Sequence, residues 1–201
     1  AQHHKRSIMA NSFQELGLNS YLIKAISELG FEKPTPVQER IIPDLLSQDN
    51  DIVCLAQTGT GKTAAFGLPS LERIVAHNME RYTQVLVLSP TRELCKQISQ
   101  DLKNYSKYLH DLCIVDVYGG AGIEPQIKAL KKIPHIVVAT PGRLLDLIGR
   151  KAVDLTRVHT LILDEADEML NMGFKEELDA ILESIPQQKR VLLFSATLPL
   201  E

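Results

Sequence analysis

The stretch DIVCLAQTGTGKT, from Asp51 to Thr63, decides the fold. It begins with apolar residues typical of a buried strand, crosses a loop with two glycines, and ends on Lys62 and Thr63 at the expected start of a helix. Gly59 and Gly61 tolerate positive φ, so several backbone N–H groups can converge on one anion above the positive end of that helix. The stretch therefore predicts a strand, an anion-binding loop and a helix, in that order.

The loop matches the phosphate-binding pattern G-x-x-x-x-G-K-[ST], the P-loop, with one departure at its first position. Its residues are Ala56, Gln57, Thr58, Gly59, Thr60, Gly61, Lys62 and Thr63. Ala56 replaces the first glycine, Lys62 would reach the β- and γ-phosphates, and the Thr63 hydroxyl would ligate Mg²⁺. A glycine-rich turn with no ligand is the alternative, and the Lys-Thr pair at a strand-to-helix junction favours the phosphate site.

Six short runs rich in Val, Ile and Leu predict strands that start near positions 51, 84, 113, 135, 160 and 191. Runs this continuously apolar are typical of strands buried on both faces, and the intervals between them leave room for crossover helices. The sequence therefore predicts an α/β fold, a mostly parallel sheet with helices on both faces.

Capping residues predict where the helices lie. Asn19 is expected to cap a helix that ends at Gly30, and Thr35-Pro36 is expected to start the next one. In the first helix, one apolar stripe is formed by Leu22, Ile26 and Leu29. In the second, the buried face is expected to carry Val37, Ile41 and Leu45, and a later helix carries Leu178, Ile181, Leu182 and Ile185.

Composition excludes several classes of protein. The 201 residues are 44% hydrophobic and 23% charged, within ordinary globular bounds. The apolar runs are far shorter than the roughly 20 residues of a membrane-spanning helix, and the first residues lack the apolar region of a signal peptide. Cys54, Cys95 and Cys113 form no C-x-x-C pair, so neither a disulfide framework nor a zinc site is expected. A reducing, cytoplasmic setting fits best.

The overall charge of the chain does not by itself indicate a nucleic-acid partner. Lys and Arg number 22 against 25 Asp and Glu, for a net charge of −3. Any nucleic-acid site must therefore be local.

A second acidic motif follows the fifth predicted strand, where Leu161-Ile162-Leu163 leads into Asp164-Glu165. Ligands of open α/β sheets bind at the carboxyl ends of strands. We expect Asp164 to hold Mg²⁺ through water and Glu165 to take a proton from an attacking water. Acids at a strand end are usually only solvated, and the P-loop about a hundred residues earlier favours the metal site here.

The whole series of motifs resembles the first RecA-like domain of DEAD-box RNA helicases. The motifs are GFEKPTPVQ (Gly30 to Gln38), AQTGTGKT (Ala56 to Thr63), PTREL (Pro90 to Leu94), Gly119-Gly120, TPGR (Thr140 to Arg143), DEAD (Asp164 to Asp167) and SAT (Ser195 to Thr197). The resemblance runs from Phe13 to Thr197 and implies ATP and Mg²⁺ as cofactors, RNA as substrate, and ATP-dependent RNA unwinding. Alanine is common at this position in the family, so Ala56 in place of the first glycine does not weaken the match to the P-loop pattern.

The resemblance also implies an adenine pocket. Gln38 would hydrogen-bond the adenine edge, because a side-chain amide offers a donor and an acceptor for N6 and N7. The Lys33 backbone and the Phe31 face would complete the pocket, and Phe13 matches the isolated upstream aromatic of the family. A core position for Phe31, and an exposed helix position for Gln38, are the alternatives.

Two further sets of residues take their roles from the resemblance. Asp167, Ser195, Ala196 and Thr197 would link the nucleotide site to domain closure, although a simple turn is the alternative. The RNA backbone would contact Pro90, Thr91, Arg92, Gly119, Gly120, Thr140, Pro141, Gly142 and Arg143, without reading base sequence. Capped helix starts with solvated arginines are the alternative, and few aromatics are expected on these loops.

The expected domain organisation is simple. Residues 1–10 are expected to form an N-terminal extension that need not be entirely native, and residues 11–201 to form the first RecA-like domain. Within it, 11–39 hold the glutamine motif and 40–201 the nucleotide-binding core. The second RecA-like domain is absent from this chain, so the chain should bind nucleotide yet hydrolyse it poorly. Competing hypotheses are a mere nucleotide- and RNA-binding module, and a P-loop ATPase that acts on DNA or protein.

Overall fold

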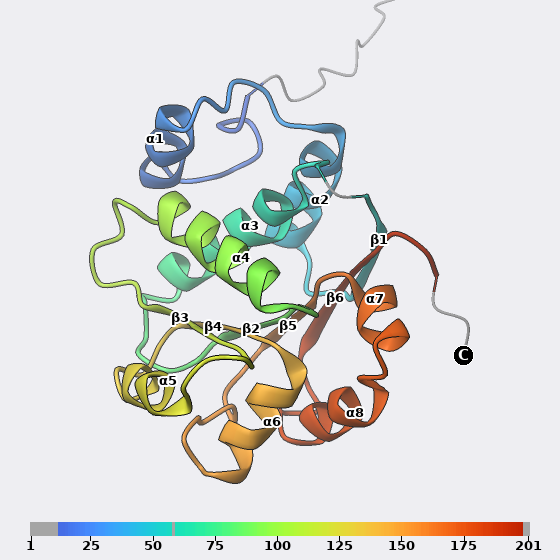
Figure 1. The fold of residues 1–201 in the computed structure, drawn as a ribbon. Coiled ribbons are helices and arrows are strands. Elements are labelled where there is room, and N and C mark those ends of the chain that lie inside the picture. The colour runs from blue at the N-terminus through green and yellow to red at the C-terminus, as the bar shows by residue number, and fades with distance from the viewer. Residues whose placement is uncertain (1–11, 58, 199–201) are drawn as a thin grey trace, which may run out of the picture.

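A computed structural model describes residues 12–57 and 59–198 as one six-stranded sheet with helices on both faces (Figure 1). The strands are β1 (Ile52–Leu55), β2 (Val85–Leu88), β3 (Ile114–Val117), β4 (Ile136–Ala139), β5 (Thr160–Leu163) and β6 (Arg190–Ser195). All five pairings are parallel, in the order β1-β6-β5-β2-β4-β3. The predicted α/β fold and all six predicted strands are confirmed.

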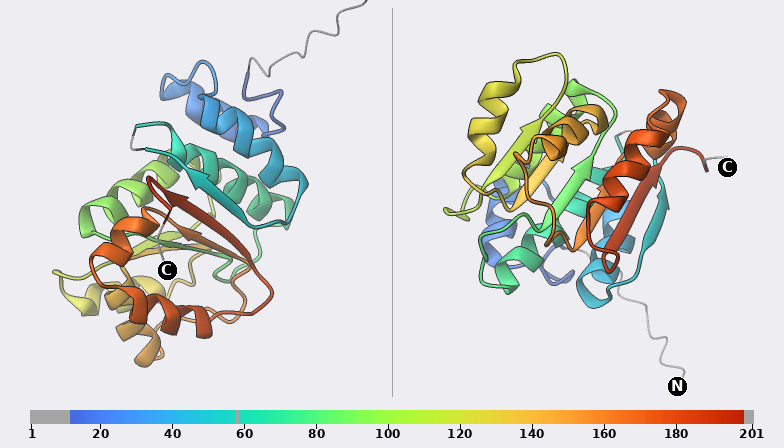
Figure 2. Two further views of the ribbon diagram at one scale, coloured as in Figure 1. Left: turned by 90° about the vertical axis from the view of Figure 1, so that its right-hand side faces the viewer. Right: turned by 90° about the horizontal axis from the view of Figure 1, so that it is seen from below.

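Eight helices of the described residues cover the sheet. They are α1 (Ser20–Glu28), α2 (Pro36–Ser47), α3 (Lys62–Ala76), α4 (Arg92–Tyr105), α5 (Ile123–Leu130), α6 (Pro141–Gly149), α7 (Ala166–Asn171) and α8 (Lys175–Glu183). Helices α1 to α4 pack in one buried cluster and α5 to α8 in another, with the sheet between them (Figures 1 and 2). None of the described helices is long and apolar enough to span a membrane.

The central strands divide their side chains between these two clusters. In β2, Val85 and Val87 belong to the α1–α4 cluster, whereas Leu86 and Leu88 belong to the α5–α8 cluster. Successive side chains of a strand point to opposite faces, so a continuous apolar run supplies both layers at once. This confirms the prediction of two-sided burial for the central strands.

The same prediction is wrong for β1. Val53 and Leu55 are 61% and 57% exposed. β1 is an edge strand that pairs only with β6, and only one of its faces is covered: Ile52 and Cys54 pack against the α1–α4 cluster, whereas Val53 and Leu55 belong to neither cluster. An apolar run does not tell a central strand from an edge strand.

The first helix begins and ends where its caps predict. Asn19 accepts hydrogen bonds from the backbone of Tyr21 and Leu22, and Gly30 turns the chain at φ +88°. Leu29 of the predicted stripe lies at the C-cap and is 45% exposed, whereas Leu22 and Ile26 are buried. The stripe ends one turn earlier, because the chain leaves the helix after Glu28.

In α8, Leu178 and Ile181 are buried, and Ile185 is buried just after the helix ends. Leu182 is 36% exposed. It is next to Ile181 in a helix whose buried residues lie on one face only.

Candidate functional site

The strand order divides the predicted motifs between two halves of one sheet edge. All strands are parallel, so every loop that follows a strand lies at the same edge. On one half, β1, β6 and β5 lead into residues 56–63, 195–197 and 164–167, and on the other, β2, β4 and β3 lead into 90–94, 140–143 and 119–120. The motifs predicted to bind nucleotide therefore share one half, and those predicted to contact RNA share the other.

The phosphate loop has the backbone that the sequence predicts. Gly61 adopts φ +81°, and a Cβ there would lie 2.5 Å from Nε2 of Gln38, so only glycine fits. Helix α3 begins at the next residue, Lys62, with its N-terminus at the loop. Thr58 lies outside the described residues.

Lys62 is paired with both acids of the second motif. Its Nζ lies 2.9 Å from Oδ1 of Asp164 and 3.5 Å from Oε1 of Glu165. Burial raises the pKa of the Asp164 carboxyl, and the neighbouring Lys62 ammonium opposes this rise. Oδ1 of Asp164 is fully buried and, despite the ion pair, receives no aligned hydrogen bond.

Glu165 has an unusual backbone that the sequence does not reveal. It is the N-cap of α7 and adopts φ +53° and ψ +53°, without a capping hydrogen bond from its side chain. Residues other than glycine rarely adopt this left-handed conformation, and such strain concentrates at functional sites. No residue pattern at Asp164-Glu165-Ala166 distinguishes it from an ordinary strand end.

Gln38 is buried against the phosphate loop, with only 2% of its surface exposed. Its Oε1 accepts a hydrogen bond from the Thr35 backbone in a capping box, and its Nε2 donates to the Gly61 carbonyl at 3.1 Å. The Thr35 hydroxyl donates to the Thr60 carbonyl at 2.9 Å. The alternative of an exposed helix residue is therefore wrong. One amide N–H and one Oε1 lone pair remain unused.

The aromatic residues expected near adenine form a core contact. Phe13 is buried, and its ring centroid lies 5.9 Å from that of Phe31, which lies 5.9 Å from that of Tyr105. Phe31 is partly buried against the α1–α4 cluster, as its alternative interpretation predicts. The Lys33 side chain is exposed.

The DEAD and SAT motifs are joined by hydrogen bonds. Oδ2 of Asp167 accepts from the Thr197 hydroxyl at 3.0 Å and from the Thr197 backbone at 3.1 Å. The Ser195 hydroxyl accepts from the Asp167 backbone N–H at 3.3 Å and donates to the Thr197 carbonyl. Ala196 between them is exposed. Burial acts to raise the pKa of the Asp167 carboxyl, but these hydrogen bonds outweigh that effect and lower the pKa.

The three segments predicted to contact RNA are also joined to one another. Arg92 donates to the Gly120 carbonyl at 3.1 Å, and the Gly119 N–H donates to the Thr140 hydroxyl at 3.3 Å. Arg143 donates to the Ala121 carbonyl at 3.0 Å. The structure therefore places them on one continuous surface at the ends of β2, β3 and β4.

Two of these segments also supply helix N-termini, as predicted. Thr91 caps α4 by accepting from the Leu94 N–H at 3.2 Å, directly after Pro90. Pro141 is the first residue of α6, followed by the exposed Gly142. Both helix starts direct backbone N–H groups to the same sheet edge, where an anion is favoured.

Sequence reasoning missed two residues of this surface. The Arg92 guanidinium lies 5.1 Å from the centroid of the Tyr118 ring, and buried Gln126 accepts from Arg143 at 3.0 Å. Gln126 also exchanges two hydrogen bonds with the Tyr118 backbone. Tyr118 could have been found from the sequence, because it directly precedes Gly119-Gly120. No sequence feature marks Gln126.

The parallel sheet and the lysine-bearing loop between β1 and α3 define the class of RecA-like P-loop domains. Residues 35–201 match the family model described as DEAD/DEAH box helicase. The match covers most of the chain, and the chain belongs to this family.

Curated relatives and a solved structure agree with this assignment. The chain is 50% identical over 188 residues to "DEAD-box ATP-dependent RNA helicase CshA" of Geobacillus kaustophilus (strain HTA426), covering 94% of this chain and 39% of that protein. It is 52% identical over 187 residues to the protein of that name from Streptococcus pneumoniae serotype 4, covering 93% of this chain and 35% of the relative. The chain thus spans well under half the length of these relatives.

Among solved structures, a DEAD box protein from the hyperthermophile Methanococcus jannaschii superposes with a TM-score of 0.87 and 46% sequence identity. The superposition covers 94% of this chain and 50% of that one. A similarity this high in both sequence and shape confirms the predicted fold class.

Proposed function

We propose that this chain is the ATP-binding half of an ATP-dependent RNA helicase, the first of two RecA-like domains that act together. The observation that carries the proposal is the ion pair of Lys62 with Asp164 and Glu165 at one end of the sheet. It brings a phosphate-binding cation and two acids, about a hundred residues apart in sequence, to one point beside a helix N-terminus.

In this proposal Lys62 exchanges partners when ATP binds. Its ammonium turns from the two carboxylates to the β- and γ-phosphates, and the backbone N–H groups of the loop around Gly61 bind the same phosphates. The exchange leaves Asp164 and Glu165 without their cation. It therefore favours binding of Mg²⁺ together with the nucleotide.

The residues present fit Mg²⁺. The buried Oδ1 of Asp164 has no aligned hydrogen-bond donor, and Thr63 follows Lys62 at the start of α3. We assign the Thr63 hydroxyl and, through water, Asp164 to hold the ion, which supplies positive charge to the phosphate oxygens. In the described chain no group of three or more His, Cys, Asp and Glu residues could hold a metal, so phosphate and water would complete the ligand set.

Glu165 is the proposed general base. Its carboxylate follows the metal-binding Asp164 by one residue, and its left-handed backbone fixes the direction in which the side chain leaves the strand. From there it would accept the proton of the water that attacks the γ-phosphate. The strained conformation supports a role beyond folding.

Gln38 is the proposed selector of adenine. Its free N–H matches the acceptor N7 and its free lone pair matches the N6 amino group. Guanine offers an acceptor, O6, where adenine has its donor. Because Gln38 also bonds to Gly61, base recognition would be coupled directly to the phosphate loop. We assign the Lys33 backbone and Phe31, which its core contacts bury only in part, to the outer side of this pocket.

We assign the second half of the sheet edge to single-stranded RNA. Arg92, Arg143 and two helix N-termini give cations and N–H donors suited to phosphates, and contacts to the backbone leave base sequence unread. Contacts to 2′-hydroxyl groups would exclude DNA. Tyr118 stacks on Arg92 and supports its orientation.

Activity of the whole protein is proposed to need a second domain beyond residues 11–201. An arginine supplied from a partner surface typically contributes about 10³–10⁵ in rate in P-loop enzymes. We propose that closure of the two domains is coupled to the nucleotide site through Asp167, Ser195 and Thr197. The three free cysteines are consistent with a reducing cytoplasm.

The test of this function uses the intact protein, with both domains. Glu165→Gln should retain ATP and Mg²⁺ binding but lose RNA-stimulated hydrolysis, since the amide keeps the shape and loses the base. The matched control Glu168→Gln changes a carboxylate one turn further along α7 and should leave hydrolysis unchanged. Hydrolysis by Glu165→Gln at the native rate would refute the assignment.

A second measurement tests the division between the two domains. ATP turnover of the 201-residue chain with saturating RNA is measured before and after the separately purified second domain is added. We expect binding without turnover in the first case and turnover in the second. Rapid turnover by this chain alone, or equal stimulation by RNA and DNA, would contradict the proposal.

A further inference from the structure

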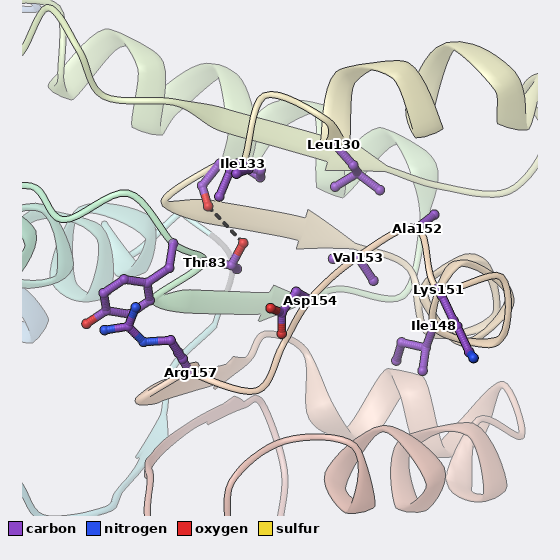
Figure 3. A pocket seen from close by; sticks show the side chains of 11 residues that line it. Thr83, Leu130, Ile133, Ile148, Lys151, Ala152, Val153, Asp154 and Arg157 are labelled. Carbon is purple, nitrogen blue, oxygen red and sulfur yellow. Dashed lines mark hydrogen bonds between the residues drawn. The ribbon is translucent and has the colours of Figure 1, made fainter.

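A cavity of about 430 Å³ opens at the amino-terminal edge of the sheet, opposite the edge that carries the motifs (Figure 3). It lies between the segments that precede β2, β4 and β5 and the end of α6. Six apolar residues line it: Leu130, Ile133, Pro134, Ile148, Ala152 and Val153. None of the motifs described above uses this cavity.

Ile133 on its rim is exposed and strained. It adopts φ +54° and is 51% exposed, whereas a β-branched residue at positive φ is an outlier. Its neighbours hold it there: Arg81 donates two hydrogen bonds to the Lys132 carbonyl, at 3.1 and 2.7 Å. The buried Thr83 donates to the Pro134 carbonyl at 2.8 Å, as Figure 3 shows. The fold thus holds an apolar side chain in water at the cavity mouth.

Charged groups stand around this apolar floor. Arg157 stacks on Tyr82, with its guanidinium 3.7 Å from the ring centroid, and Lys151 adopts φ +57° at the end of α6. Stacking fixes the guanidinium plane. Its Nη2 lies 3.5 Å from Oε2 of Glu80 in a solvent-exposed ion pair, so a carboxylate of the occupant would replace Glu80 there. Asp154 is the acid of the lining, and its Oδ1 accepts two hydrogen bonds from Thr156. Its charge is therefore already partly compensated.

Residues next to the cavity lining add to the positive charge around the cavity. Lys131 and Lys132 are exposed directly before Ile133. This local excess of cations occurs in a chain whose net charge is −3. An occupant with acidic groups beside an apolar side chain would match both the rim and the floor.

We propose that this cavity docks an acidic peptide segment of a protein partner, with one large apolar side chain inserted beside Ile133 and carboxylates on Lys151 and Arg157. An RNA strand fits less well, because its phosphates match the rim but it has no aliphatic group for the floor. Because the rim residues are already held in one conformation, less conformational entropy is lost when the peptide binds.

The docking site is independent of the proposed helicase function. Strands β2, β4 and β5 separate it from the motif edge, and a four-residue strand spans roughly 10 Å or more. A substitution at Ile133 or Lys151 is therefore expected to leave nucleotide binding unchanged, so failure of one proposal is distinguishable from failure of the other.

The test is a selection of displayed random dodecapeptides on the 201-residue chain. Enriched peptides should carry Leu, Met or Phe with Asp or Glu nearby. The synthesised consensus peptide should lose at least about tenfold in affinity on Ile133→Gly and on Lys151→Glu. Glycine relieves the positive φ at 133, so that variant should fold as stably as the native chain or more so.

Leu29→Gly is the matched control, because it removes an exposed aliphatic side chain at the end of another helix. It should leave peptide affinity unchanged. The proposal is overturned by no enrichment, by enriched peptides without the acidic and apolar pattern, or by equal binding to both rim variants. Displacement of the peptide by oligouridine RNA would also overturn it and identify a nucleic-acid site instead.

Discussion

Substituting Gly61 by alanine tests whether the glutamine motif and the phosphate loop form one structural unit. The new Cβ would lie 2.5 Å from Nε2 of Gln38 and 3.0 Å from the Thr35 hydroxyl. It would also sit at φ +81°, which costs an L-residue about 1–2 kcal/mol. Moving the Gln38 amide breaks its bonds to Thr35 and Gly61, at about 1 kcal/mol each.

These contributions add to a loss of about 3–4 kcal/mol in the free energy of unfolding for Gly61→Ala. For a chain of this size the midpoint temperature should fall by about 10 °C. Urea denaturation followed by circular dichroism measures the free energy, and calorimetry measures the midpoint. Gly149→Ala is the control, since no atom lies within 4 Å of its Cβ position and its φ is not positive.

The double variant Gln38→Ala/Gly61→Ala separates the clash from the backbone strain. Without the amide, only the strain and the closer contacts with Thr35 remain, so Gly61→Ala should cost about 2 kcal/mol in that background. Equal costs in both backgrounds would refute the coupling. A change below about 0.5 kcal/mol for the single variant, the range of ordinary surface substitutions, would refute the loop geometry itself.

Three further predictions concern other parts of the chain. Asn19→Ala should lower the free energy of unfolding by about 1–2 kcal/mol in urea titrations, because it removes the α1 cap and the contact with Glu72. Burial lowers the pKa of His159 to about 4, from 6.5, so its neutral form stabilises the fold above pH 6.5 and this contribution is lost as the pH falls toward 4. Thermal melts of His159→Gln across this range should show a weaker pH dependence than the native chain. Arg143→Ala should weaken RNA binding equally for all base sequences and reduce its salt dependence, in fluorescence titrations, whereas Gln126→Ala should weaken it less.

Local rules sufficed for much of the fold. Asn19, Gly30 and Thr35 act within a few residues of where they stand, so the helix boundaries they set were predictable. The position of β1 at the edge was not, because strand order depends on which crossovers pack together and not on the run itself. The exposure of Val53 depends further on which faces the helices cover, because β3 at the other edge is largely buried.

The candidate site likewise combines features that the sequence predicts with features that it does not. The glycines of the phosphate loop and the acids after β5 follow patterns that a sequence displays, and the structure brings Lys62 to within ion-pair distance of Asp164. The Gly61 partner of Gln38, the partners of Arg143 and the backbone of Glu165 do not follow from any pattern, although the Thr35 partner of Gln38 follows from the capping-box spacing. Each depends on a contact across the fold or on one backbone angle, which the identity of neighbouring residues leaves open.

The boundary between the two halves of the motif edge falls at β5 and β2, which pair directly. Their carboxyl ends carry Asp164 and Ser89, and each has a buried side-chain oxygen without a hydrogen-bond partner, Oδ1 and Oγ. Oδ1 of Asp164 is held only by its ion pair with Lys62, and Oγ of Ser89 has no partner, although buried polar groups are normally hydrogen-bonded. A change of partner at Asp164, when Lys62 turns to phosphate, would therefore occur next to the strand that leads into Arg92. This pair of strands links the proposed nucleotide site directly to the proposed RNA surface, so Ser89→Ala should weaken the mutual dependence of ATP and RNA binding more than it weakens either alone.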